Sequence, residues 1–86
     1  MPEICRFYGI VIKMYFADHA PPHFHAEYAE YEARIAIDSL AVISGKLPPR
    51  AMGLVAEWTT LHQQELTALW EKATRLEPLD RLAPLP

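Results

Sequence analysis

The sequence predicts an α+β fold in which a small antiparallel sheet of three or four strands is packed by one long C-terminal helix. Before residue 47, runs of β-branched and aromatic residues and an apolar/polar alternation with a period of two are typical of strands. After Pro48, apolar residues recur at intervals of three and four, which is typical of a helix. Strands that are followed by a helix, instead of alternating with helices, indicate the α+β class.

The chain has 86 residues, which is the size of a single domain. We divide it into a β-sheet part (1–46), a helical part (48–76) and a tail rich in proline and leucine (77–86). A chain this short buries only about 60–65% of the surface that it exposes when unfolded. The core is therefore small, and each large apolar residue matters to it.

Composition and charge exclude several classes of protein. Hydrophobic residues make up 51% of the chain and charged residues 22%, which is typical of a folded domain. The net charge of −3 argues against general nucleic-acid binding, because such proteins neutralise phosphates with excess cations. The single cysteine, Cys5, allows no internal disulfide, and no apolar run approaches the roughly 20 residues that span a bilayer. We expect a cytoplasmic protein without a secretion signal or a membrane segment.

Four strands are expected, over residues 6–16, 23–28, 31–38 and 41–46. In the first strand Gly9 is expected to mark a bulge or a close approach of another backbone. Alternation predicts which side chains face the core, namely Tyr8, Ile10, Ile12, Met14, Phe24, Ala26, Tyr28, Ala33, Ile35 and Ile37. Ala29 and Glu30 lie between two alternating runs at the distance of a hairpin turn.

The helix is expected to begin at the Pro48–Pro49 pair and to end near residue 76. About 26 helical residues span about 39 Å, whereas the sheet is only about 20 Å long. The helix therefore either breaks near residues 59–60 or extends beyond the sheet. In the second case the distal stripe (Leu66, Leu69, Trp70 and Ala73) would pack against a second copy of the chain or a partner protein.

The candidate site is the segment HAPPHFHAEY, residues 19–28, which holds three of the four histidines. Pro21 and Pro22 stiffen the loop that precedes the strand. Alternation then places His23, His25 and Glu27 on one face, while Phe24 and Tyr28 anchor the other face in the core. The candidate catalytic residues are His19, His23 and His25, and the candidate metal ligands are these three with Glu27.

Three interpretations of these histidines remain open. They and Glu27 can bind a divalent ion such as zinc, provided that His19 completes the set, because same-face side chains on a strand are about 7 Å apart. Two imidazoles can also act as acid and base in phosphodiester cleavage, which would make RNA a substrate. The third interpretation is a solvated strand face without a ligand. Arg6, Tyr8, Phe24, Glu27, Tyr28 and Trp70 are the candidate binding residues around this surface and on the helix.

Two further side chains stand out in the helical part. His62 follows Trp58 by about one turn and is expected to be half-buried. Arg50 lies in the first helical turn, where the helix dipole is unfavourable for a cation, so a carboxylate or phosphate partner is expected to hold it.

The segments MPEICRFYGIVIKMYFADHAPPHFHAEYAEYEARIAI, LPPRA and LVAEWTTLHQQELTALW resemble the bacterial family catalogued as domain of unknown function 4160, over residues 1–70. The chain departs from that family at Ala29, where glycine is expected. The resemblance implies a small stand-alone protein whose neighbouring gene encodes a small partner, as in toxin–antitoxin modules. It therefore implies the toxin-like half of a two-protein module that acts by binding its partner. A histidine-dependent or metal-dependent phosphodiesterase or ribonuclease, and a simple divalent-metal-binding module, are the alternatives.

Overall fold

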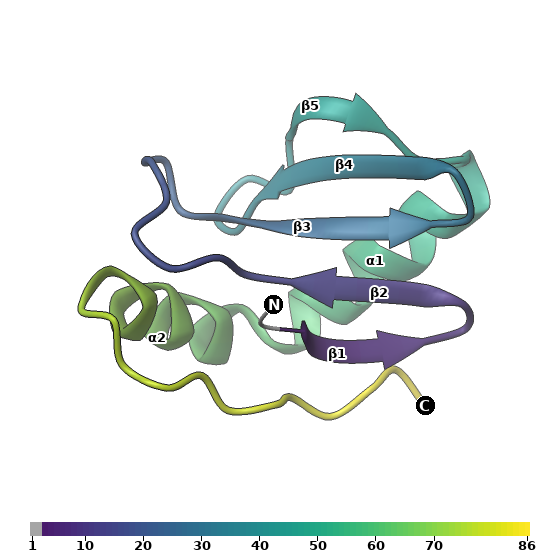
Figure 1. Cartoon of the computed structure of the whole chain (residues 1–86). Coiled ribbons are helices and arrows are strands. Elements are labelled where there is room, and N and C mark those ends of the chain that lie inside the picture. Colours follow the sequence, from purple (N-terminus) through teal and green to yellow (C-terminus); the bar gives the residue numbers. More distant parts are fainter. Residues whose placement is uncertain (1–2) are drawn as a thin grey trace.

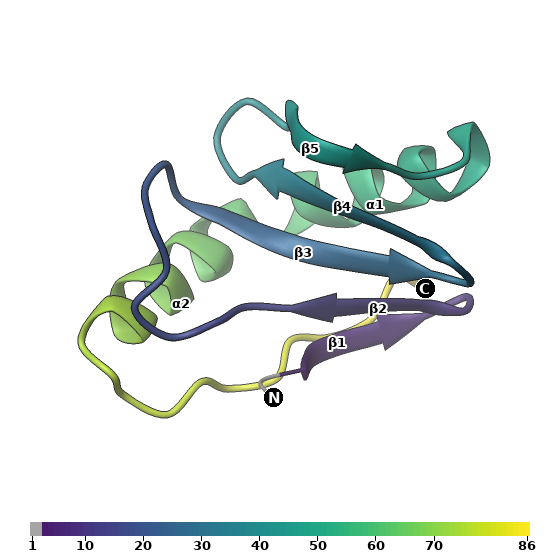
Figure 2. The same ribbon diagram turned by 45° about the horizontal axis from the view of Figure 1, so that its top comes forward.

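A computed structural model, which describes residues 3–86, shows a two-layer α+β structure (Figure 1). The described residues form five strands and two helices: β1 (Glu3–Phe7), β2 (Ile10–Lys13), β3 (His23–Tyr28), β4 (Tyr31–Ala36), β5 (Val42–Lys46), α1 (Pro49–Leu61) and α2 (Gln63–Thr74). The strands form one antiparallel sheet in the order β1-β2-β3-β4-β5. Both helices lie on the same face of this sheet in two views (Figures 1 and 2). The predicted α+β class with an antiparallel sheet is confirmed, whereas the sheet has five strands instead of three or four.

The first predicted strand is in fact a hairpin of β1 and β2. Tyr8 and Gly9 form its two-residue turn, with φ angles of 50° and 80°, which is the conformation of the tight hairpin turns that Asn-Gly pairs favour. Gly9 therefore belongs to a turn and not to a bulge. The prediction that Ile10, Ile12 and Met14 face the core is confirmed, whereas Tyr8 is 60% exposed.

The other strands agree with the predicted pattern, except that His23, which alternation placed on the outward face of β3, is only 3% exposed. Tyr28 pairs with Tyr31 across the predicted Ala29–Glu30 turn, and Ala29 has a φ of 52°. The inward residues of the second and third predicted strands are buried, namely Phe24, Ala26, Ala33, Ile35 and Ile37, although Tyr28 at the end of β3 is 36% exposed. The last predicted strand is β5, an edge strand whose apolar residues Val42 and Ile43 are both exposed.

The prediction of a single long helix was wrong, because the chain leaves helical geometry at His62. This residue has φ −124° and ψ 21° and separates α1 from α2. The break lets α2 change direction and pack against the loop between β2 and β3, where the N–H of Ala17 donates to the carbonyl of Ala73 (Figure 1). The distal stripe (Leu66, Leu69, Trp70 and Ala73) is at most 8% exposed within its own chain. The chain itself therefore covers this stripe, so the reason for expecting another chain there is lost.

The tail, residues 77–86, runs beside β1 and closes one edge of the core (Figure 2). The N–H of Leu82 donates to the carbonyl of Ile4 at 2.8 Å. Leu85 is only 7% exposed. None of the helices within residues 3–86 has the length and apolar character that crossing a membrane requires.

Candidate metal centre

Three potential ligands meet where the loop after β2 enters β3. They are Asp18 in the loop, His23 as the first residue of β3, and His25 two residues further on. Long-range hydrogen bonds fix both ends of the loop: the N–H of Ala17 donates to Ala73 at the end of α2, and the N–H of Ile37 donates to Pro22. Asp18 is therefore held between two points that are tied to other elements.

The two imidazoles converge on one carboxylate oxygen. Nε2 of His23 lies 3.0 Å from Oδ2 of Asp18, and Nε2 of His25 lies 3.4 Å from the same oxygen. All three ligand atoms lie within 4.8 Å of one another. Around a tetrahedral zinc ion with bonds of 2.0–2.1 Å, ligand atoms are about 3.4 Å apart. The three groups thus have nearly the spacing that joint coordination requires.

The orientation of His23 is fixed by its other ring nitrogen. Nδ1 donates to the carbonyl of Pro21 at 2.8 Å, and a carbonyl can only accept, so Nδ1 carries a proton. The ring is 3% exposed and packs against Trp70 with a centroid distance of 5.2 Å. Nε2 is consequently free either to carry a second proton toward Asp18 or to present its lone pair to a metal.

The ring of His25 also has one nitrogen toward Asp18 and the other toward an oxygen atom, here that of a carboxylate. Its Nδ1 lies 3.6 Å from Oε2 of Glu32, on the neighbouring strand β4. The ring of Tyr15 meets it edge to face at 4.5 Å. Metal-binding histidines usually face a carbonyl or carboxylate with the nitrogen that does not bind the metal. His23 and His25 both do so.

The carboxyl group of Asp18 is ionised at neutral pH. Partial burial acts to raise its pKa, but the N–H of His19, which donates to Oδ1 at 2.8 Å, and the two histidine rings together lower the pKa below its usual value. A carboxylate must be deprotonated to bind a metal ion. Asp18 therefore needs no further activation to serve as a ligand.

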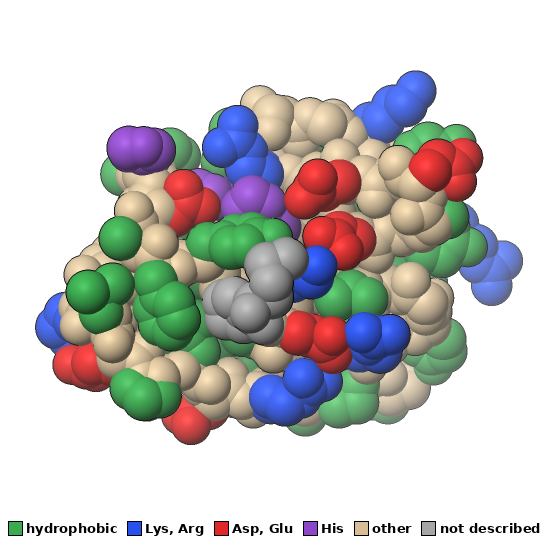
Figure 3. Space-filling model, viewed as in Figure 1, with side chains coloured by type: hydrophobic (Ala, Val, Ile, Leu, Met, Phe, Trp, Pro, Cys, Tyr) green, Lys and Arg blue, Asp and Glu red, His purple; other side chains and the backbone are tan. Residues whose placement is uncertain are grey.

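The cluster is partly open to solvent. The side chains of Asp18 and His25 are 19% and 15% exposed, whereas that of His23 is 3% exposed. A hollow of about 190 Å³ adjoins His25 and is lined by His25, Glu32, Ala33, Arg34, Ser44 and Gly45. Figure 3 shows histidine side chains between acidic and basic side chains on this face of the sheet. A water molecule or a small substrate can thus approach the cluster from the His25 side.

The structure does not bring the other two predicted ligands to the cluster. The side chain of His19 is exposed and only its backbone N–H contacts Asp18. Oε2 of Glu27 accepts a hydrogen bond from Nζ of Lys13 at 3.0 Å. Asp18 takes the place that the sequence interpretation gave to His19.

The candidate binding residues lie in different parts of the molecule. Arg6 pairs with Glu3 at 2.8 Å, and the hydroxyl of Tyr8 donates to the carbonyl of Pro86. Phe24 and Trp70 are 0% and 8% exposed, so they support the site from inside the fold. His62 is half-buried, as expected, with Nδ1 2.6 Å from Oε1 of Glu65.

Sequence reasoning missed Asp18 and Glu32 as members of the site. Asp18 lies five residues before His23, and the proline loop folds it back onto the strand. Glu32 contacts His25 because β3 and β4 form a hairpin, in which Glu32 pairs with Glu27. The hairpin was predicted, so its register could have identified Glu32.

The fold and the site define a small α+β domain with a preformed Asp/His/His cluster beside an open sheet face. The family model described as "Domain of unknown function (DUF4160)" matches residues 9–71, and the chain belongs to this family. No curated protein and no solved structure matches the chain.

Proposed function

We propose that this protein binds one divalent transition-metal ion, such as zinc, through Asp18, His23 and His25. The observation that carries the proposal is the convergence of both Nε2 atoms on Oδ2 of Asp18, at 3.0 and 3.4 Å. Nδ1 of His23 donates to the carbonyl of Pro21, which orients that ring, and Nδ1 of His25 lies 3.6 Å from the carboxylate of Glu32. Nitrogen and carboxylate ligands in this number suit zinc or a related ion.

The reaction class that this site favours is hydrolysis. Three protein ligands leave a coordination position for water, as in catalytic zinc sites, and the ion lowers the pKa of that water to near neutrality. Arg34 is the cross-strand neighbour of His25 and lines the adjoining hollow. A guanidinium beside a metal favours an anionic substrate, so a phosphodiester such as RNA is the substrate class that we propose.

Metal binding is tested by isothermal titration of untagged, metal-free protein with zinc, together with elemental analysis. We expect one ion per chain and a loss of affinity of about 100-fold or more in Asp18→Asn and His25→Gln, because each removes a ligand. His19→Gln and His62→Gln are matched controls that should bind like the wild type. Wild-type protein that binds no zinc, or equal losses in His19→Gln and His25→Gln, would refute the site.

The resemblance also favours a second role, as the cytoplasmic toxin-like half of a two-protein module. One observation is compatible with partner binding: β5 is an edge strand with exposed Val42 and Ile43, whereas the tail runs beside β1 at the other edge. Co-expression with the product of the neighbouring gene tests this role. We expect the two proteins to purify as a complex that Ile43→Lys disrupts, and independent elution of the two wild-type proteins would argue against it.

A further inference from the structure

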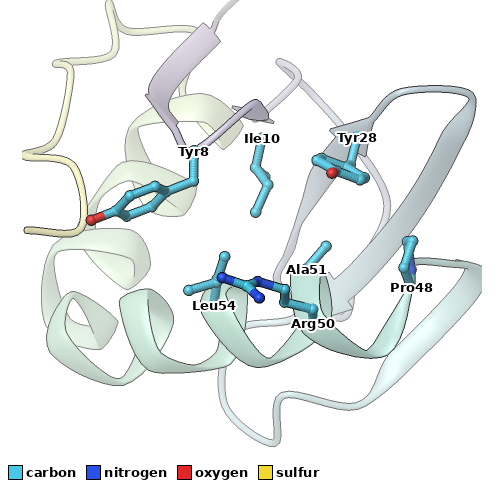
Figure 4. A pocket seen from close by; sticks show the side chains of 7 residues that line it. All are labelled: Tyr8, Ile10, Tyr28, Pro48, Arg50, Ala51 and Leu54. Carbon is cyan, nitrogen blue, oxygen red and sulfur yellow. The ribbon is translucent and has the colours of Figure 1, made fainter.

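A second hollow, of about 290 Å³, lies at the opposite end of β3 from the metal centre. It is lined by Tyr8, Ile10, Tyr28, Pro48, Arg50, Ala51 and Leu54 (Figure 4). The two hairpin turns and the first turn of α1 meet here. These residues therefore come from three separate parts of the chain.

The floor of this hollow is apolar. Ile10 is 0% exposed and Ala51 4% exposed, and Leu54 is half-buried beside them. A cavity of about 150 Å³ accommodates a benzene molecule. The hollow thus has room for an aromatic ring or a branched aliphatic group together with a short polar substituent.

Arg50 supplies the only charge among the residues that line the hollow. Within residues 3–86 no carboxylate lies within ion-pair distance of Arg50, whereas Arg6, Lys13, Lys72, Arg75 and Arg81 all have such partners. The first turn of α1 contains no acidic residue that would balance this cation. Figure 4 shows the Arg50 side chain running from the first turn of α1 along the side of the hollow that faces Tyr8 and Ile10. A positive charge over an apolar floor is complementary to an anion with an apolar body.

Two tyrosines form the rim. Tyr8 is 60% exposed and has a φ of 50°, a conformation that bulky residues rarely adopt. Tyr28 is 36% exposed and its ring reaches the turn, since a Cβ atom placed on Gly9 would lie 3.4 Å from Cε1 of Tyr28. Aromatic rims of this kind pack against flat ligands.

We infer that this hollow binds a small organic acid with one carboxylate and an aromatic or branched aliphatic body. Arg50 binds the carboxylate, with two parallel N–H donors matched to its two oxygens. The apolar body lies over Ile10, Ala51 and Leu54. A phosphate monoester fits less well, because it carries about −1.5 to −2 charges and the hollow offers one cation.

The inference is tested with 3-phenylpropionate and its neutral amide as probes, titrated into the metal-free protein and followed by backbone amide NMR. We expect saturable chemical-shift changes at Ile10 and Ala51 for the acid. The affinity for the amide should be at least about tenfold lower. Arg50→Gln should weaken the acid about tenfold or more and leave the amide unchanged. Lys46→Gln, which removes another cation without an ion pair among the described residues, is the matched control and should bind like the wild type.

A second variant, Tyr8→Asn, removes one wall while placing in the turn a residue that tolerates a positive φ. It should weaken both probes while its amide spectrum remains that of a folded protein. Absence of saturable binding by the acid, equal binding of acid and amide, or tighter binding of phenyl phosphate than of 3-phenylpropionate would each overturn the inference. Equal losses in Arg50→Gln and Lys46→Gln would do the same, because they would indicate a general effect of net charge.

Discussion

The indole N–H of Trp58 donates to the carbonyl of Ala83 at 2.9 Å, across 25 residues of sequence. Trp58 is completely buried, and its ring packs against Phe7 and Phe24 at centroid distances of 5.5 and 5.9 Å. A buried indole needs an acceptor for its N–H, and the tail provides one. The tail is therefore an integral part of the core.

Leu85→Ala should lower the free energy of unfolding by about 2–4 kcal/mol, because Leu85 is 7% exposed and its removal leaves a cavity in the core. Urea denaturation followed by tryptophan fluorescence measures this loss. Leu76→Ala is the matched control, since Leu76 is 68% exposed and its truncation should change stability by about 0.5 kcal/mol or less. Equal effects of the two variants would show that the tail is not packed in solution.

Attachment of the tail should weaken in acid. Hydrogen bonds from Arg6 and then Arg81 lower the pKa of Glu3 from 4.5 to about 2, and Arg81 belongs to the tail. Because the pKa is lower in the folded state, the stabilisation is complete above pH 4.5 and is lost as the pH falls toward 2. Wild type should therefore exceed Glu3→Gln in stability above pH 4.5, and the difference should shrink as the pH falls through about 2 and vanish below it. A difference that is constant with pH would contradict the role of this carboxylate.

Two glycines should respond in opposite ways to alanine. A Cβ atom on Gly45 would lie 2.1 Å from the carbonyl oxygen of Glu32, and Gly45 has a φ of 75°, so Gly45→Ala should cost about 2 kcal/mol or more. Gly53 lies within α1 with nothing within 4 Å of its Cβ position, so Gly53→Ala should stabilise by about 0.5–1 kcal/mol. Thermal unfolding of both variants measures this contrast. A tolerated Gly45→Ala would mean that β5 does not hold this register on β4.

The β3–β4 hairpin could be predicted from the sequence, because apolar and polar residues alternate in both strands and only two residues separate them. The β1–β2 hairpin could not, since Tyr8 occupies a left-handed position that is usually filled by Asn or Gly. The break at His62 carries no glycine or proline. Only the mismatch between helix length and sheet length indicated that the helix had to break or extend.

The histidine pattern identified His23 and His25 but not the carboxylate that joins them. Asp18 and His19 are neighbours in the same loop, and the path of the backbone decides which side chain points to the strand. Long-range bonds set this path, from Ala17 to Ala73 and from Ile37 to Pro22. Such contacts depend on α2 and β4 and have no signature within the loop itself.

The burial of His23 changes what substitution of the two histidines should do. Alternation placed His23 and His25 on one outward face. If that face were merely solvated, each substitution would change the free energy of unfolding by about 0.5 kcal/mol or less. His23 is instead 3% exposed and bonded to Pro21 and Asp18. Without metal, His23→Gln should therefore cost about 1–3 kcal/mol, because buried partners are left unsatisfied. His25→Gln should cost about 1 kcal/mol or less.

Zinc distinguishes ligation from packing at these two positions. Zinc at about 100 times its dissociation constant should stabilise the wild type by about 2.7 kcal/mol. The ion should stabilise neither His23→Gln nor His25→Gln, although only the first is strongly destabilised without it. Denaturation of all three proteins with zinc and with chelator measures both effects. Zinc stabilisation that persists in His25→Gln would show that the ion binds elsewhere, and the Asp18/His23/His25 site would be refuted.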